Sequence, residues 1–98
     1  PYYRLVYVYL KNHNESLLDQ MAVVMAGKLR AVFGNRVLGP DKPPVARIQT
    51  LFIKKIVVKI EQNAPMGRAR ELLLRIQREM IEDERYKSLI VYYDVDPM

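Results

Sequence analysis

The sequence contains no cysteine and a single histidine, His13. Disulfide bonds, thiolate nucleophiles and cysteine zinc sites are therefore excluded, and we expect neither a metal nor a cofactor in this chain. No apolar run approaches the roughly 20 residues that span a bilayer, and the N-terminus lacks the order of segments found in a secretory signal. We therefore expect a cytoplasmic protein with no membrane span.

Catalytic motifs are also missing, since there is neither a glycine-rich phosphate loop nor a nucleophile elbow. His13 lies in a turn before a predicted helix with no nucleophile nearby, which favours a structural role. Asp94 and Asp96 are spaced to leave one face of a strand. Two carboxylates without further ligands favour a turn or an interdomain salt bridge over a metal site. We predict no catalytic residue.

The chain is long enough for one domain. Of its 98 residues, 50% are hydrophobic and 28% are charged, so one core can be buried and general disorder is not expected. The first predicted strand begins almost at Pro1. We therefore expect residues 1–98 to form a single accessory domain of a longer protein.

Alternating and helical patterns of apolar residues predict the elements. They indicate a strand at 3–10, a helix at about 15–33, a strand at 51–62, a helix at 63–83 and a last strand at 88–97. Asn12 or Asn14 is expected to cap the first helix, Asn12 with Glu15 in a capping box, and Asn63 the second. Three prolines within residues 36–49 predict an irregular edge strand that a loop interrupts.

The order βαββαβ predicts an α+β two-layer sandwich, in which two helices cover one face of a four-stranded, mostly antiparallel sheet, as in ferredoxin-like folds. The uncovered face would expose Lys55, Lys59, Tyr92 and five candidate interdomain residues. These five are Tyr3, Leu5, Tyr7, Tyr9 and Val57. Tyrosines beside lysines can stack bases, but docking on another domain or a second copy is favoured, because monomers seldom expose large apolar patches.

The net charge of +5 is concentrated in residues 36–59, which carry six basic residues against Asp41 alone. The six candidate DNA contacts are Arg36, Lys42, Arg47, Lys54, Lys55 and Lys59. The proline-rich loop from Lys42 to Arg47 is the strongest candidate because loops project and can follow a backbone. Charge alone does not separate DNA from RNA or from an acidic protein surface.

The second predicted helix is also rich in arginine. Glu71 with Arg75, and Arg78 with Glu82, have the i,i+4 spacing of ion pairs. We therefore predict a charge-balanced, solvated face for that helix.

Four segments, NHN, RVLGPDKPPVARI, KKIVVKI and the ending YYDVDPM, together resemble the C-terminal domain of the PriA family, primosomal protein N′. In that family a V-L-G-P segment precedes a proline-rich basic hairpin, an alternating basic and aliphatic strand follows, and the protein ends on D-V-D-P. Val37 to Pro40 and Asp94 to Pro97 occupy those places here. The resemblance covers essentially the whole chain, and its specificity lies in the order and spacing of the motifs.

The resemblance implies an ATP-dependent 3′ to 5′ DNA helicase that acts in primosome assembly and replication restart. ATP, magnesium and zinc would then belong to other domains of the parent protein. The resemblance also implies a fold like a small-subunit ribosomal protein. The implied partners are branched or forked DNA, the remainder of the helicase, single-strand binding protein and primosome proteins. We expect a DNA-binding and interdomain docking module without enzymatic activity; the alternative is a stand-alone RNA-binding or small-ligand regulatory domain.

Overall fold

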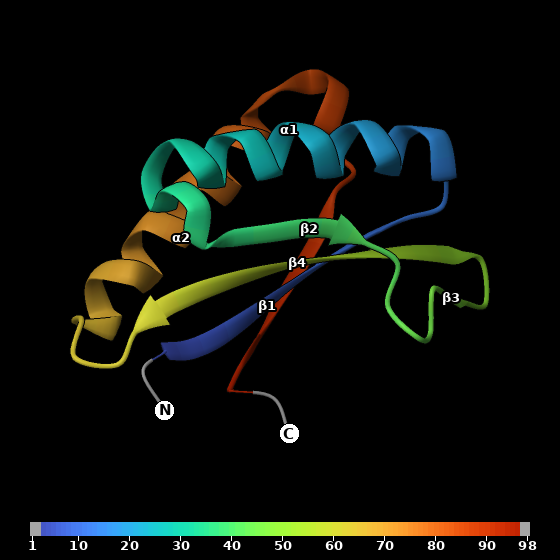
Figure 1. Cartoon of the computed structure of the whole chain (residues 1–98). Helices are drawn as coiled ribbons and strands as arrows, with labels where there is room; N and C mark the ends of the chain where they lie inside the picture. The colour runs from blue at the N-terminus through green and yellow to red at the C-terminus, as the bar shows by residue number, and fades with distance from the viewer. Residues whose placement is uncertain (1–2, 97–98) are drawn as a thin grey trace.

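Two helices cover one face of an antiparallel sheet in the computed structural model, which describes residues 3–96 (Figure 1). The strands are β1 (Tyr3–Asn12), β2 (Val37–Asp41), β3 (Arg47–Ile48), β4 (Leu51–Glu61) and β5 (Ile90–Val95). The helices are α1 (Glu15–Phe33) and α2 (Met66–Glu82), with short 3-10 turns η1 (Gly34–Arg36) and η2 (Glu84–Tyr86). The predicted α+β class is confirmed.

The sheet has the strand order β2-β4-β1-β5, and every neighbouring pair is antiparallel. Each helix connects two strands with one strand inserted between them, which is the ferredoxin-like layout that the element order predicts. β4 lies inside the sheet, between β2 and β1. The irregular proline-rich edge is also confirmed, since β2 ends at Asp41 and β3 adds only two residues to the edge of β4.

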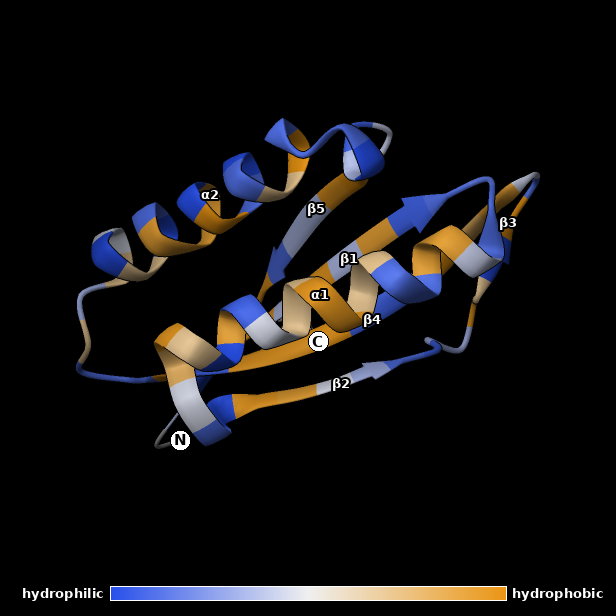
Figure 2. Ribbon diagram, turned by 90° about the horizontal axis from the view of Figure 1, so that it is seen from above, coloured by the Kyte–Doolittle hydropathy of each residue, from blue (hydrophilic) through white to orange (hydrophobic). Residues whose placement is uncertain are grey.

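The core lies between the helices and the sheet, and Figure 2 shows α1 and α2 side by side above the strands. Its largest fully buried side chains are Leu10, Leu18, Met21, Met25, Leu29, Ile56 and Met80. The apolar residues that recur at helical spacing along α1 are buried except for Val32, which is 41% exposed near the end of the helix. Within residues 3–96, no helix has the length and apolar character needed to cross a membrane.

The two asparagines before α1 have different roles. Asn14 is the cap, because its side-chain oxygen accepts the backbone N–H of Leu17 at 3.0 Å. Asn12 is the last residue of β1 and is buried; its amide donates to the carbonyl oxygen of Ser88 at 3.2 Å. The predicted capping box of Asn12 with Glu15 is therefore wrong, because Asn12 fastens β1 to the segment before β5.

At the second helix, Pro65 occupies the N-cap position and α2 begins at Met66. The predicted cap, Asn63, is wrong because it lies two residues too early to reach the first turn. The start of α2 therefore has no side-chain cap bond.

Candidate nucleic-acid interface

The side of the sheet away from the helices, called the open face below, carries a mixed apolar and basic surface. The strand register places residues of four strands together on it, because directly paired residues share a face. They are Tyr3, Leu5, Tyr7, Tyr9, Lys11, Leu38, Asp41, Ile53, Lys55, Val57, Lys59, Glu61, Ile90, Tyr92 and Asp94. All five residues predicted for the interdomain surface lie on this face, and Tyr92 joins them as predicted.

Three lysines of the open face lie over tyrosine rings. The ammonium of Lys55 is 4.4 Å from the ring centre of Tyr7. Lys59 lies 5.7 Å from the ring of Tyr3. Lys11 lies 4.6 Å from the ring of Tyr92. The open face is therefore a cationic surface as well as an aromatic one.

Lys11 is a functional candidate that the sequence analysis missed. It lies outside residues 36–59, where the charge surplus was found. The signal that identifies it is its position two residues after Tyr9, because alternate residues of a strand point to the same face.

A row of three tyrosines crosses the open face. The rings of Tyr9 and Tyr92 are stacked with centroids 4.8 Å apart and planes inclined by 16°. Tyr7 meets Tyr9 edge-on with centroids 6.2 Å apart. Partial burial raises the pKa of Tyr9, and the neighbouring Tyr92 and Asp94 raise it further, so its hydroxyl is neutral at physiological pH.

The loop between β2 and β3, residues 42–46, borders one end of the open face. It extends away from the helices, below the sheet in Figure 1. Ile53 lies on the open side of β4 opposite Lys11, yet it is only 3% exposed, and Pro43 of the loop is also buried. The backbone N–H of Ile53 donates to the carbonyl of Ala46 at 2.8 Å, which ties the loop to β4. Lys42 is exposed in this loop and therefore lies at the border of the open face.

Arg47 is exposed but belongs to the other side of the hairpin. It pairs with Phe52 in the register and lies over that ring, 5.1 Å from its centre. The two basic ends of the predicted DNA-binding loop, Lys42 and Arg47, therefore lie on different surfaces. Only Lys42 adjoins the open face.

Two predicted DNA contacts have intramolecular partners. Lys54 pairs with Leu10 on the helix side of the sheet, and its ammonium lies 3.2 Å from a carboxylate oxygen of Asp19 on α1. Its side chain is only 18% exposed. Arg36 donates to the carboxylate of Glu61. Each of these two cations therefore already has a counter-charge within the domain, which a phosphate would have to displace.

The ion pairs predicted along α2 do not form within residues 3–96. Glu71 instead lies 3.4 Å from Arg68, one turn earlier. Arg75 and Arg78 are exposed without a carboxylate partner in the described chain. The predicted i,i+4 pairs are therefore wrong, whereas the solvated face of α2 is confirmed, and the helix carries four arginines against three glutamates.

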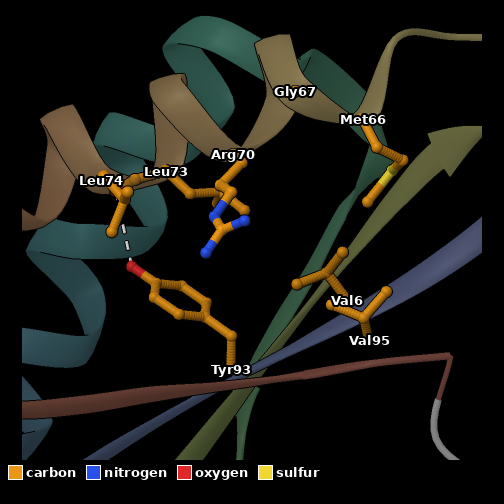
Figure 3. Close-up of a pocket in the computed structure, with 8 residues that line it drawn as sticks. All are labelled: Val6, Met66, Gly67, Arg70, Leu73, Leu74, Tyr93 and Val95. Atoms are coloured by element: carbon orange, nitrogen blue, oxygen red, sulfur yellow. Dashed lines mark hydrogen bonds between the residues drawn. The ribbon is translucent and has the colours of Figure 1, made fainter.

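A cavity of about 490 Å³ lies between the N-terminal half of α2 and strands β1 and β5 (Figure 3). It is lined mainly by apolar side chains, and Arg70 and Tyr93 point into it. The hydroxyl of Tyr93 donates to a side-chain oxygen of Gln77 at 2.8 Å. Burial raises the pKa of Tyr93 to about 12. No motif in the sequence indicates this cavity.

The remaining candidates are structural. Asp96 forms an ion pair with Arg4 at 2.9 Å, and its hydrogen bond from Arg4 lowers its pKa; this salt bridge lies within the domain, whereas the sequence favoured a turn or an interdomain one. His13 is bonded to the hydroxyl of Thr50 at 3.0 Å, which links the start of α1 to the β3–β4 turn. The described residues hold no group of three or more side chains suited to a metal ion. Pro97 of the D-V-D-P motif lies outside the described residues.

Comparison with known proteins supports the fold and adds no function. Neither a family model nor a curated protein matches the sequence. The chain is similar to the solved structure of "De novo designed protein Foldit4", with a TM-score of 0.67, 11% sequence identity and 98% of each chain covered. At this identity the likeness shows the arrangement of helices and strands alone.

Proposed function

We propose that this chain is the DNA-binding accessory domain of a PriA-type ATP-dependent 3′ to 5′ helicase. The parent would act in the cytoplasm on branched or forked DNA during primosome assembly and replication restart. The motif order from NHN to D-V-D-P supports the parentage. ATP, magnesium and zinc would be bound by the parent's other domains, and this domain would catalyse nothing alone.

The observation that carries the proposal is a group of lysines on one side of the molecule. Lys11, Lys55 and Lys59 lie on the open face and Lys42 in the bordering loop. Within residues 3–96 none of the four has a carboxylate partner. Lys54, which precedes Lys55 in the sequence but lies on the helix side of the sheet, has one. Unpaired ammonium groups on one surface bind phosphates without reading bases, so we expect binding that tolerates any sequence.

The test is the salt dependence of DNA binding. If three or four phosphates are neutralised, the slope of log affinity against log salt should be about −3 to −4 on duplex DNA. Replacing Lys42 and Lys59 together by glutamine should flatten the slope by about two units. The matched control replaces Arg75 and Arg78 by glutamine and should leave the slope unchanged. A wild-type slope near zero, or equal flattening by both pairs, would contradict the proposal.

Interdomain docking is the second candidate function for the same face. It is favoured by apolar side chains at the rim, since Leu38, Ile90 and Tyr92 are 46%, 46% and 40% exposed. If the face docks, its amides should exchange hydrogen more slowly in the intact parent than in the isolated domain, without DNA. If it binds DNA, exchange should be the same in both proteins and should slow only when DNA is added.

A further inference from the structure

We propose that the open face binds unpaired bases, so that a single-stranded segment of DNA stacks on the tyrosines while the lysines now covering the rings move to its phosphates. This inference rests on the proposed DNA-binding function. It adds that the open face selects single-stranded DNA over duplex DNA.

Without DNA, lysine side chains lie over the tyrosine rings of the open face. Tyr7 has the ammonium of Lys55 over it at 4.4 Å. Tyr92 has Tyr9 stacked against it and Lys11 over the ring at 4.6 Å. The rings of Tyr7 and Tyr92 are thus each covered in part by a flexible, charged lysine side chain. These groups keep the surface hydrated when no ligand is bound.

When a single strand binds, each tyrosine ring exchanges a lysine for a base, and the lysine moves to a phosphate. An exposed cation–π contact is weaker than the stacking of a base on a tyrosine ring. Lysine has a flexible four-carbon stem, so an ammonium displaced from a ring can reach a phosphate beside it. A single strand therefore replaces each weak contact by a stacked base and a charge-assisted phosphate contact. A phosphate backbone without bases gains only the phosphate contact.

The open face discriminates against duplex DNA. In a duplex the bases stack on one another and offer only their edges in the grooves. The strands that carry Tyr7, Tyr9 and Tyr92, β1 and β5, are neighbours in the sheet, and their rings can stack only on a base whose flat face is free, as in a single strand. Open sheets bearing aromatic residues bind single-stranded nucleic acid in this way.

Charge favours DNA over a protein as the occupant. Three ammonium groups lie on the open face and Lys42 lies at its border, whereas the carboxylates in its register are Asp41, Asp94 and Glu61, of which Glu61 is already bonded to Arg36. A protein that covered this face would have to supply several carboxylates or leave ammonium groups desolvated. A strand carrying one phosphate per nucleotide supplies the counter-charge along its whole length.

The experiment compares three fluorescent DNA probes of equal length with the whole chain: a single strand, the same strand with abasic positions, and a blunt duplex. The single strand should bind at least about tenfold more tightly than the abasic strand, because each stacked base contributes about that much. The salt slopes for these two probes should agree, because the phosphates are the same.

The variant Tyr92→Leu should remove most of the advantage of the single strand over the abasic strand and leave abasic binding unchanged. Tyr92 is 40% exposed on an edge strand, so the variant keeps the core, which thermal unfolding by circular dichroism checks. Tyr93→Phe, on the helix side of the same strand, is the matched control and should bind all three probes as the wild type does.

Each outcome decides one proposal. Equal affinity for the single and abasic strands, or tighter binding of the duplex, overturns the stacking inference and leaves phosphate binding standing. Binding to none of the probes overturns DNA binding itself. If the amides of the open face are then protected in the intact parent, the face is a protein-docking surface.

Discussion

Lys54 and Lys55 are adjacent in the sequence but lie on opposite faces of β4, and this pair allows a matched test. Lys54 lies under α1 beside Asp19, and Lys55 lies on the open face over Tyr7. We consider the variants Lys54→Gln and Lys55→Gln. Both replace one lysine of the same two-residue segment by glutamine, so they have the same net charge and the same composition.

The expected effects differ in kind. If Lys55 neutralises one phosphate, Lys55→Gln lowers the steepness of the salt slope by about 0.9 on duplex DNA and about 0.7 on single strands. The advantage of the wild type over Lys55→Gln on duplex DNA should then shrink by about eightfold for each tenfold rise in salt. Lys54→Gln should leave the slope unchanged, because its ammonium already contacts a carboxylate on the other face.

The stability of the two variants shows whether either of them misfolds. An ion pair with one largely exposed partner contributes about 0–1 kcal/mol, and an exposed cation–π contact about 0.5–1 kcal/mol. Both variants should therefore lose at most about 1 kcal/mol, or roughly 4–8 °C in Tm for a domain of this size. Fluorescence anisotropy at four or more salt concentrations measures the slopes. Equal changes of slope, or a larger change for Lys54→Gln, would refute the assignment of the two faces.

Three further predictions concern the core, the cavity and the activity. Met25→Ala should lower the free energy of unfolding by about 2–5 kcal/mol in urea titrations, because Met25 is fully buried, whereas Val23→Ala at a 64% exposed site should change it by less than about 0.5 kcal/mol. The raised pKa of Tyr93, about 12 against about 10 in the unfolded chain, means that its contribution to stability is complete below pH 10 and is lost as the pH rises toward 12. Tyr93→Phe should lack this alkaline loss, and identical pH profiles of the two proteins would contradict it. The purified domain should hydrolyse no ATP above background, and hydrolysis that survives removal of contaminants would show a nucleotide site that the sequence does not reveal.

The fold could be predicted from sequence because its signals are local. The alternation along β1 and β4 places Val8 and Ile56 on one face and Tyr7 and Val57 on the other, and the structure confirms both assignments. The helical spacing in α1 gave its bounds, because the buried stripe and the glycine at Gly34 mark where the helix ends.

The partners of the charged residues could not be predicted in the same way. Whether Lys54 meets Asp19 depends on how α1 crosses the sheet, and Arg36 meets Glu61 only through the pairing of distant segments. Asn12 was equally acceptable as a helix cap until its contact with Ser88, 76 residues away, placed it in the sheet. Local patterns thus predicted which face of the sheet each residue occupies. The ion pairs, which decide which cations are available to bind phosphate, could be identified only from the tertiary structure.

The most direct test of DNA binding by the open face is a titration of the ¹⁵N-labelled domain with forked DNA, followed by NMR. We predict that the amide signals of β1, β4, β5 and the loop at residues 42–46 shift together, with the side-chain ammonium signals of Lys11 and Lys55. The signals of α2 around Arg75 and Arg78 should remain in place. Shifts confined to α2, with the open face unchanged at saturating DNA, would contradict the account.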